Sequence, residues 1–169
     1  IKHLGNGFLQ AHSNQRLREQ LRSGQLSALD YYHQLLRFVY RLIFLFVAED
    51  RDLLLAPNIP PEIRERYFNY FSTNRLRHLA DRQRGTRHTD IYQSLLLVME
   101  KLGSTTGCTE LGLPALGGFL FSTQAIPDLM NCQIDNHSIL DAVRSLAFTI
   151  SNGTKRAVDY RNLGSEELG

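Results

Sequence analysis

The stretch VYRLIFLFVAEDRD, residues 39–52, joins an apolar run directly to a cluster of acidic residues. Its uncharged apolar part covers residues 42–48 and is too short for a membrane span, which needs about 20 residues. Upstream, His33, Arg37 and Arg41 recur every four residues and therefore form one polar stripe along a helix. Because the other faces of this helix are apolar, we predict that it lies at the centre of a soluble helical core.

The start of this helix is marked by a capping pattern. Ser27 can accept a hydrogen bond in the first turn, and Asp30 stands three residues further on, as in a capping box. The apolar periodicity continues to the acidic cluster, so the helix is predicted to run over residues 28–52. Phe44, in the middle of the apolar run, is predicted to be a core residue.

The acidic cluster of Glu49, Asp50 and Asp52 could suggest a metal site or acid–base catalysis. However, neighbouring residues on a helix point in different directions, so these side chains do not converge on one ion. Acidic residues at the C-terminal end of a helix are also unfavourable for the helix dipole. We therefore predict that these acids form ion pairs with nearby arginines.

The rest of the chain also has the pattern of short helices. The predicted fold class is mainly α: a multi-helix, bundle-like single domain over residues 1–169, with a Gly-rich irregular segment and at most a small β element. The Gly-rich segment, residues 103–121, is too broken for a helix. The remaining elements are predicted as helices over 14–21 (capped by Ser13 or Asn14, ended by Gly24), 62–71 (started by Pro60 or Pro61), 73–83, 90–102 (started by Thr86 or Thr89) and 137–150 (capped by Asn136, ended by Asn152 and Gly153), and a weak strand over 155–162.

The composition is that of an ordinary globular domain, with 169 residues, 43% of them hydrophobic and 21% charged. A domain of this size can bury a substantial core. The chain begins at Ile1 rather than at a methionine, and residues 166–168 look like the start of another helix, so we expect it to be part of a longer protein. Cys108 and Cys132 lack the spacing of zinc ligands, and reduced thiols are typical of a cytoplasmic protein.

The positive charge is concentrated in residues 64–87, which contain seven arginines but only two acidic residues. Such a run is either a solvated helical face or a surface that faces a phosphate backbone. A guanidinium group can bind a phosphate through two parallel hydrogen bonds. The candidate DNA-binding residues are Arg75, Arg77, Arg82, Arg84 and Arg87, with Arg16, Arg18 and Arg22 as the alternative set.

No motif for catalysis, cofactor binding or metal binding is recognisable. Gly112, Gly117 and Gly118 fit neither a dinucleotide-binding loop nor a phosphate-binding loop. The stretch NIPP, residues 58–61, differs from the Asn-Pro-Pro-Tyr motif of amino-group methyltransferases, because an isoleucine separates the asparagine from the prolines. We therefore predict no catalytic, cofactor-binding or metal-binding residue in this chain.

Several stretches together resemble a known family. They are GNGFLQAHSNQRLREQLRSGQLSALDYYHQLL (5–36), LLRFVYRLIFLFVAEDRDLL (35–54), LGLPALGGFLF (111–121) and VDYRNLGSEELG (158–169). This ordered set is similar to part of the large single-chain type II restriction–modification proteins and the related phage-exclusion adenine-specific DNA methyltransferases. The resemblance covers nearly the whole chain.

The resemblance implies a role for the chain. In that family a helical connector lies between an N-terminal nuclease or accessory region and a methyltransferase domain, which would follow residue 169 here. The parent protein would use S-adenosylmethionine, and Mg²⁺ where it cleaves DNA, whereas the connector would hold no cofactor. Its expected partners are the flanking domains and duplex DNA, with no membrane contact.

Two other function classes remain open from the sequence. The chain could be a protein-interaction module without DNA contact, in which Tyr67, Phe68, Tyr70 and Phe71 form a docking surface. It could also be a small stand-alone enzyme, although no converging set of polar residues supports this. Salt-dependent DNA binding would distinguish the connector from the interaction module.

Overall fold

The computed structural model describes residues 1–162, and the helix start expected at 166–168 lies outside them. The prediction of a mainly α fold with a small β element is confirmed. Among the described residues, no helix is long and apolar enough to cross a membrane. The α-helices are α1 (Lys2–Gln10), α2 (Gln15–Ser23), α3 (Ala28–Asp50), α4 (Pro61–Tyr70), α5 (Thr73–Arg82), α6 (Asp90–Gly103), α7 (Gly118–Phe121) and α8 (Asn136–Ala147); the 3-10 turns are η1 (Thr109–Leu111), η2 (Thr123–Ala125) and η3 (Leu129–Asn131); and β1 (Phe148–Ser151) pairs antiparallel with β2 (Thr154–Ala157).

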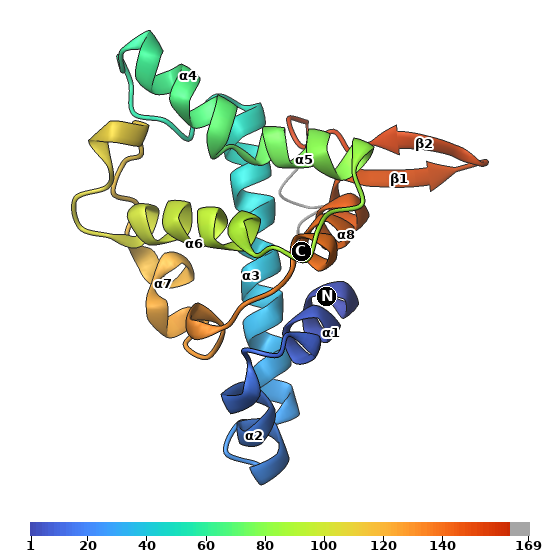
Figure 1. The fold of residues 1–169 in the computed structure, drawn as a ribbon. Helices are drawn as coiled ribbons and strands as arrows, with labels where there is room; N and C mark the ends of the chain where they lie inside the picture. Colours follow the sequence, from blue (N-terminus) through green and yellow to red (C-terminus); the bar gives the residue numbers. More distant parts are fainter. Residues whose placement is uncertain (163–169) are drawn as a thin grey trace.

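Helix α3 is the long axis of the fold, and the other helices pack along it (Figure 1). Its start agrees with the prediction, because the Ser27 side chain accepts a hydrogen bond from the Asp30 backbone N–H. The helix ends at Asp50, and Asp52 already has a left-handed backbone with a φ of 56°. The predicted end at residue 52 is therefore slightly too late.

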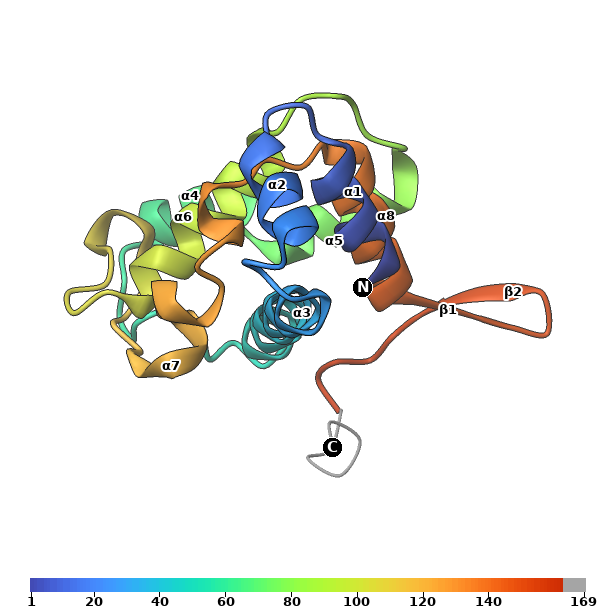
Figure 2. The same ribbon diagram turned by 90° about the horizontal axis from the view of Figure 1, so that it is seen from below.

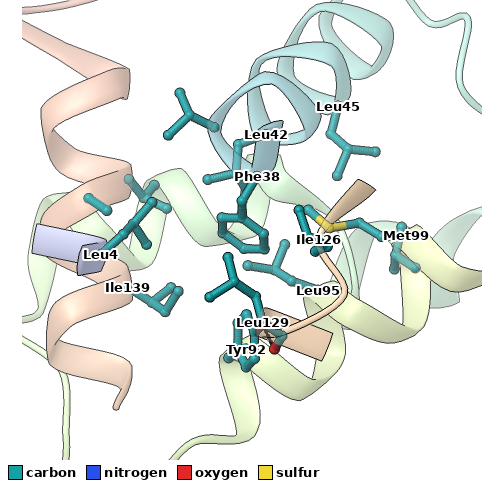
Figure 3. Close-up of a cluster of buried hydrophobic side chains, with 14 of the residues drawn as sticks. Leu4, Phe38, Leu42, Leu45, Tyr92, Leu95, Met99, Ile126, Leu129 and Ile139 are labelled. Atoms are coloured by element: carbon teal, nitrogen blue, oxygen red, sulfur yellow. Dashed lines mark hydrogen bonds between the residues drawn. The ribbon is translucent and has the colours of Figure 1, made fainter. Parts of the chain in front are cut away.

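The core forms where α3 meets α1, α6 and α8 (Figure 3). Tyr92 of α6 lies between two phenylalanine rings, 5.6 Å from Phe38 and 5.2 Å from Phe8 between ring centroids. Its hydroxyl donates to the Leu129 carbonyl oxygen at 2.7 Å, so the buried polar atom has a partner. The central side chains, labelled in Figure 3, are Leu4, Phe38, Leu42, Leu45, Tyr92, Leu95, Met99, Ile126, Leu129 and Ile139.

One face of α3 is not covered by the described residues. Phe44 is 38% exposed and contacts the Phe121 ring at its edge, so the prediction that Phe44 is a core residue is wrong. Tyr32 and Tyr40 are exposed along the same side of the helix. Figure 2 shows α3 nearly end-on at the margin of the helical body. The helix is apolar on nearly all sides, yet other elements surround it on only part of its circumference.

Two arginines of the polar stripe on α3 bind the part of the chain that contains α7 and η2. Arg41 is 1% exposed and donates to the Leu120 and Ser122 carbonyl oxygens at 2.6 and 2.7 Å. Arg37 donates to the Ala125 carbonyl oxygen at 3.0 Å. These guanidinium groups satisfy carbonyls at the ends of short helical turns, where no backbone partner exists. Burial lowers the pKa of Arg41 to about 10.

The Gly-rich segment is less irregular than predicted, because η1 and α7 lie within it. Gly107, before η1, and Gly112, directly after it, have positive φ values that allow the tight turns on both sides of η1. The segment therefore combines turns with single helical turns, rather than forming a continuous loop.

The prediction for the last helix and strand was only partly correct. Asp135, not Asn136, caps α8, since its side chain accepts from the Ser138 backbone N–H at 2.7 Å. The helix ends at Ala147 and the chain continues as strand β1. Asn152 and Gly153 do not end a helix; they have φ values of 51° and 76° and form the two-residue turn of a hairpin.

The other predicted boundaries agree with local signals in the sequence. Pro61 starts α4, the Ser72 side chain caps α5, and Thr89 precedes α6. Gly24 ends α2 with a φ of 75°. Asn14 stands at the start of α2, as predicted, but its side chain bonds the Phe8 and Gln133 carbonyl oxygens instead of capping the helix.

Candidate nucleic-acid interface

Two of the three acids at the end of α3 pair with arginines, as predicted. Asp50 accepts two hydrogen bonds from Arg77, at 2.5 and 2.9 Å, in a bidentate ion pair. Asp52 accepts from Arg64 at 2.6 Å in a more exposed pair. Both arginines come from the segment 64–87, so part of its positive charge is neutralised inside the fold.

Glu49 does not contact an arginine, and the prediction is wrong for this residue. Its buried carboxylate accepts from the Tyr67 hydroxyl and from the backbone N–H groups of Thr73 and Asn74, each at 2.7 Å. Thr73 and Asn74 open α5, so the carboxylate binds the positive end of that helix. Burial raises the pKa of Glu49, although these hydrogen bonds act in the opposite direction.

Arg77 is therefore set apart from the other predicted DNA-binding residues. Besides its ion pair with Asp50, its guanidinium group lies 5.0 Å from the centre of the Phe46 ring, and only 15% of its side chain is exposed. Arg77 shares the inward face of α5 with Leu76 and Ala80, which are buried. The helical spacing of these residues could have indicated this from the sequence alone.

The remaining four candidates, Arg75, Arg82, Arg84 and Arg87, are all exposed. Within residues 1–162, no hydrogen bond or ion pair involves the side chain of any of them. Arg75 and Arg82 lie two turns apart on the outward face of α5. We refer to these four residues as the arginine surface.

The backbone that carries Arg84 and Arg87 is held firmly against the start of α8. The backbone N–H of Asn136 donates to the His88 carbonyl oxygen at 2.7 Å, and that of His137 donates to the Thr86 carbonyl oxygen at 3.2 Å. The Arg84 carbonyl oxygen lies 2.6 Å from the His137 Nδ1 atom. The two arginines are therefore long side chains on a fixed loop.

Gly85 and Arg144 fix the path of the same loop. Gly85 has a φ of 91°, and a Cβ atom there would lie 2.6 Å from the His137 Cα atom, so the close approach requires glycine. Arg144 of α8 donates to the carbonyl oxygens of Ala80 and Gln83, both at 2.7 Å. These bonds satisfy the C-terminal end of α5 and hold the loop against α8.

The alternative arginine set on α2 also contains one residue that bonds the fold and two that do not. Arg18 donates to the Leu9 and Ala11 carbonyl oxygens at 3.1 and 2.6 Å, and so caps the end of α1. Arg16 and Arg22 are more open, and their side chains make no hydrogen bond or ion pair in the described part of the chain. They are therefore suitable controls for the arginine surface.

A further arginine, Arg156 on β2, was missed by the sequence analysis. It is exposed and has no hydrogen-bond or ion-pair partner within residues 1–162. Its neighbour Lys155 pairs with Asp81 of α5, which brings the hairpin beside the arginine surface. The Asn-Gly pair between two runs of residues that favour strands could have indicated this hairpin.

The described residues also hold no evident metal centre, since no group of three or more His, Cys, Asp or Glu side chains could bind one ion. A cleft of about 230 Å³ lies between the end of α4 and the starts of α5 and α6. It is lined mainly by Tyr70, Phe71, Arg75 and Ile91, with Asp90 and Ser94 at its polar side. The aspartate is already bonded to the Asn136 amide.

Comparison with known proteins gives no matching family model, no significantly similar curated protein and no significantly similar solved structure. The fold and the candidate site therefore define a class rather than a family. The chain forms a mainly helical domain with a small hairpin and an exposed surface of arginines whose side chains the described fold does not use.

Proposed function

We propose that this chain is a helical connector of a type II restriction–modification protein, which positions an adenine-specific DNA methyltransferase domain and contacts the DNA backbone. The sequence resemblance supports the parent class, and the arginine surface supports the DNA contact. Arginines that stabilise a fold have partners within it, whereas these four point outward from a fixed backbone. The gathering of four such arginines within residues 75–87 is the observation that carries the proposal.

The spacing of the arginine surface is suitable for a phosphate backbone. Arg75 and Arg82 lie about 10 Å apart along the helix axis, at a rise of 1.5 Å per residue. That distance equals about three rises of 3.4 Å along the axis of a DNA duplex. Contacts of this kind set the register of a protein on DNA without reading the sequence.

The proposal includes the parent protein. Its methyltransferase domain would bind S-adenosylmethionine, and its nuclease region, where present, would use Mg²⁺. The connector would act through its position and its surface and would hold neither group. A protein that modifies bacterial DNA would work in the cytoplasm.

Fluorescence anisotropy with duplex DNA tests the contact. The 169-residue chain should bind with a dissociation constant of about 10⁻⁴–10⁻⁶ M, regardless of sequence. The triple variant Arg82→Ala, Arg84→Ala, Arg87→Ala should bind more weakly, and its log–log salt slope should be flatter by about 0.9 for each phosphate that it no longer neutralises. The matched control is the double variant Arg16→Ala, Arg22→Ala, which removes exposed arginines from α2.

The outcome separates the proposal from a solvated charged surface. Equal weakening per arginine removed, three in the triple variant and two in the α2 control, would show that net charge alone matters. A chain that does not bind DNA at low salt would refute the DNA contact, since electrostatic attraction is strongest there. Circular dichroism of each variant verifies that its helix content is unchanged.

A protein-interaction module is the second candidate, and the uncovered face of α3 favours it. Leu29, Tyr32 and Tyr40 are 62%, 45% and 46% exposed and lie along one side of the helix with Phe44. Large apolar side chains that are exposed along one side of a helix are typical of a contact with another protein. A photo-crosslinker at Tyr40 would identify what covers this face in the full-length protein.

The aromatic docking surface expected from the sequence is not formed as a unit. Tyr67 is fully buried and bonds Glu49, and Phe68 and Phe71 are half-buried. Tyr70 alone among the four is largely exposed, at 64%. The protein-interaction candidate therefore rests on α3 and not on α4.

A further inference from the structure

The β1–β2 hairpin projects away from the helical body (Figures 1 and 2). Every residue from Thr149 to Ala157 is exposed. An isolated two-stranded hairpin has little stability of its own, because it buries almost no apolar surface. Its role is therefore not to complete the core.

The register of the hairpin gives it two different faces. Phe148 and Lys155 lie on the face that is turned toward α5, where Lys155 pairs with Asp81 and lies 4.1 Å from the centre of the Phe148 ring. Thr149 pairs with Arg156, and Ser151 pairs with Thr154, on the opposite face. This second face is directed away from α5 and is open to solvent.

The chemistry of the second face is uniform. Thr149, Ser151 and Thr154 each present a hydroxyl group, and Arg156 presents a guanidinium group. The hairpin contains no acidic residue between positions 148 and 157. Hydroxyl and guanidinium groups are common donors to phosphate oxygens in DNA complexes. Because these hydroxyl side chains are small, the backbone of the hairpin can approach a DNA backbone closely.

The hairpin is attached firmly at its base, so its position relative to α5 is defined. The Val158 backbone N–H donates to the Ala147 carbonyl oxygen at 2.9 Å, which extends the ladder into the end of α8. The Tyr160 hydroxyl donates to the Leu146 carbonyl oxygen at 2.9 Å, and its ring packs on Phe46. The hairpin therefore continues from the C-terminal end of α8, and the Lys155–Asp81 ion pair sets it beside the C-terminal end of α5, where Arg82 stands.

We infer that the hairpin is a second DNA-contacting element, which enters a groove beside the phosphates bound by the arginine surface. This inference rests on the proposed function. Each strand of the hairpin is about 13 Å long at 3.3 Å per residue, and a two-stranded ribbon fits the major groove, which is about 12 Å wide. Ile150 pairs with Lys155 on the face turned toward α5, so the proposed contact is made by the hydroxyl groups and Arg156 of the second face.

A DNA-cleaving iron chelate attached to the hairpin tests the inference. Thr154→Cys carries the chelate on the open face, in a background with Cys108→Ser. Cys132 needs no replacement, because it is buried and burial raises the pKa of its thiol to about 11. The matched control is Thr105→Cys, an exposed threonine that follows α6, whose C-terminal end lies on the side of the molecule away from the hairpin (Figure 1).

The Thr154 chelate should cut bound duplex DNA, and the Thr105 chelate should cut it at least 10-fold less. If the chain binds DNA but the Thr154 chelate does not cut it, the hairpin inference is refuted and the proposed function stands. The open strand edges would then be candidates for pairing with a polypeptide. If the unlabelled chain does not bind DNA at all, the proposed function fails first.

Arg156 provides an independent measurement. Arg156→Ala should flatten the log–log salt slope by about 0.9, the value for one phosphate. Arg22→Ala, the control on α2, should leave the slope unchanged. An unchanged slope for Arg156→Ala together with a reduced slope for the arginine-surface variant would also refute the hairpin contact and leave the proposed function intact.

Discussion

Glu49→Ala should strongly destabilise the domain, although the residue contacts no cation. The substitution removes the acceptor of the Tyr67 hydroxyl and the Thr73 backbone N–H, which are buried, and of the partly buried Asn74 backbone N–H. An unsatisfied buried donor costs about 1–3 kcal/mol, so the two buried donors cost about 2 kcal/mol or more. For a domain of this size the expected decrease in melting temperature is at least about 4–8 °C.

Two variants show whether the cause is the removal of these hydrogen bonds. Glu49→Gln keeps one acceptor oxygen but places an NH₂ group against a backbone donor, so it should cost less than Glu49→Ala. Asp52→Ala is the matched control, because Asp52 is an acid of the same cluster, 65% exposed and paired with Arg64. An exposed pair contributes about 0–1 kcal/mol. The free energies of unfolding follow from urea titrations monitored by circular dichroism.

The effect of Glu49→Ala on stability should also depend on pH, in a direction that the pKa of Glu49 determines. Burial raises the pKa of Glu49 above its value in the unfolded chain, which is about 4.3. Between these two pKa values the folded chain binds more protons, so the contribution of Glu49 to stability is complete below pH 4.3 and decreases as the pH rises. The difference in stability between the wild type and Glu49→Ala should therefore shrink as the pH rises above about 4.3.

Two results would refute this reasoning. If Glu49→Ala costs no more than Asp52→Ala, the three donors find other partners and the buried acceptor is not important. If the stability difference grows with pH, the hydrogen bonds outweigh burial, and the pKa of Glu49 is lowered.

The other two predictions concern α3 and catalysis. Leu42→Asp should abolish the cooperative melting transition, because Leu42 is fully buried and an unpaired charge there costs several kcal/mol. Phe44→Asp should cost only about 1 kcal/mol, and loss of folding in this variant would mean that the face is covered. The 169-residue chain should transfer no methyl group from labelled S-adenosylmethionine to DNA, and with Mg²⁺ it should not cleave DNA; methyl transfer above the buffer rate would contradict the connector proposal.

Several helix starts and ends were predictable, because the signals that set them are local, whereas α1 was not predicted. Ser27 and Ser72 bond backbone groups three residues ahead, and Gly24 adopts the left-handed conformation that ends α2. These interactions involve only a few neighbouring residues. A single sequence therefore contains nearly all the information that they require.

The hydrogen-bond partners of the buried polar side chains could not be predicted in the same way. Glu49 bonds groups in α4 and α5, which follow a proline-containing loop, and Arg41 bonds carbonyl oxygens at the C-terminal end of α7. Such partners depend on how distant elements pack, and an arginine or a glutamate has the same appearance in sequence wherever its partner lies. The sequence indicated that partners were needed, but it did not indicate which ones.

The apolar pattern of α3 was misinterpreted for a related reason. Periodicity shows which positions avoid water, but it does not distinguish a core from a surface that another protein covers. Phe44 and Tyr40 have the same spacing as buried residues and yet lie on the open side. The last helix posed the opposite problem: Phe148 continues the apolar pattern of α8, but the Asn-Gly turn favours a hairpin, and the turn decided the structure.

The arginines divide into two groups by what their side chains contact, and this division carries the functional argument. Arg18, Arg41 and Arg144 bind carbonyl oxygens at the ends of helical turns, so their removal should affect folding. The arginine surface and Arg156 have no such partners among residues 1–162, so their removal should leave the fold intact. A positive residue that the fold does not need, placed on a backbone that the fold holds rigid, is well suited to bind something outside the chain. Loss of helix content on replacing Arg82, Arg84 and Arg87 would contradict this division, and the surface would then have to be explained as part of the fold.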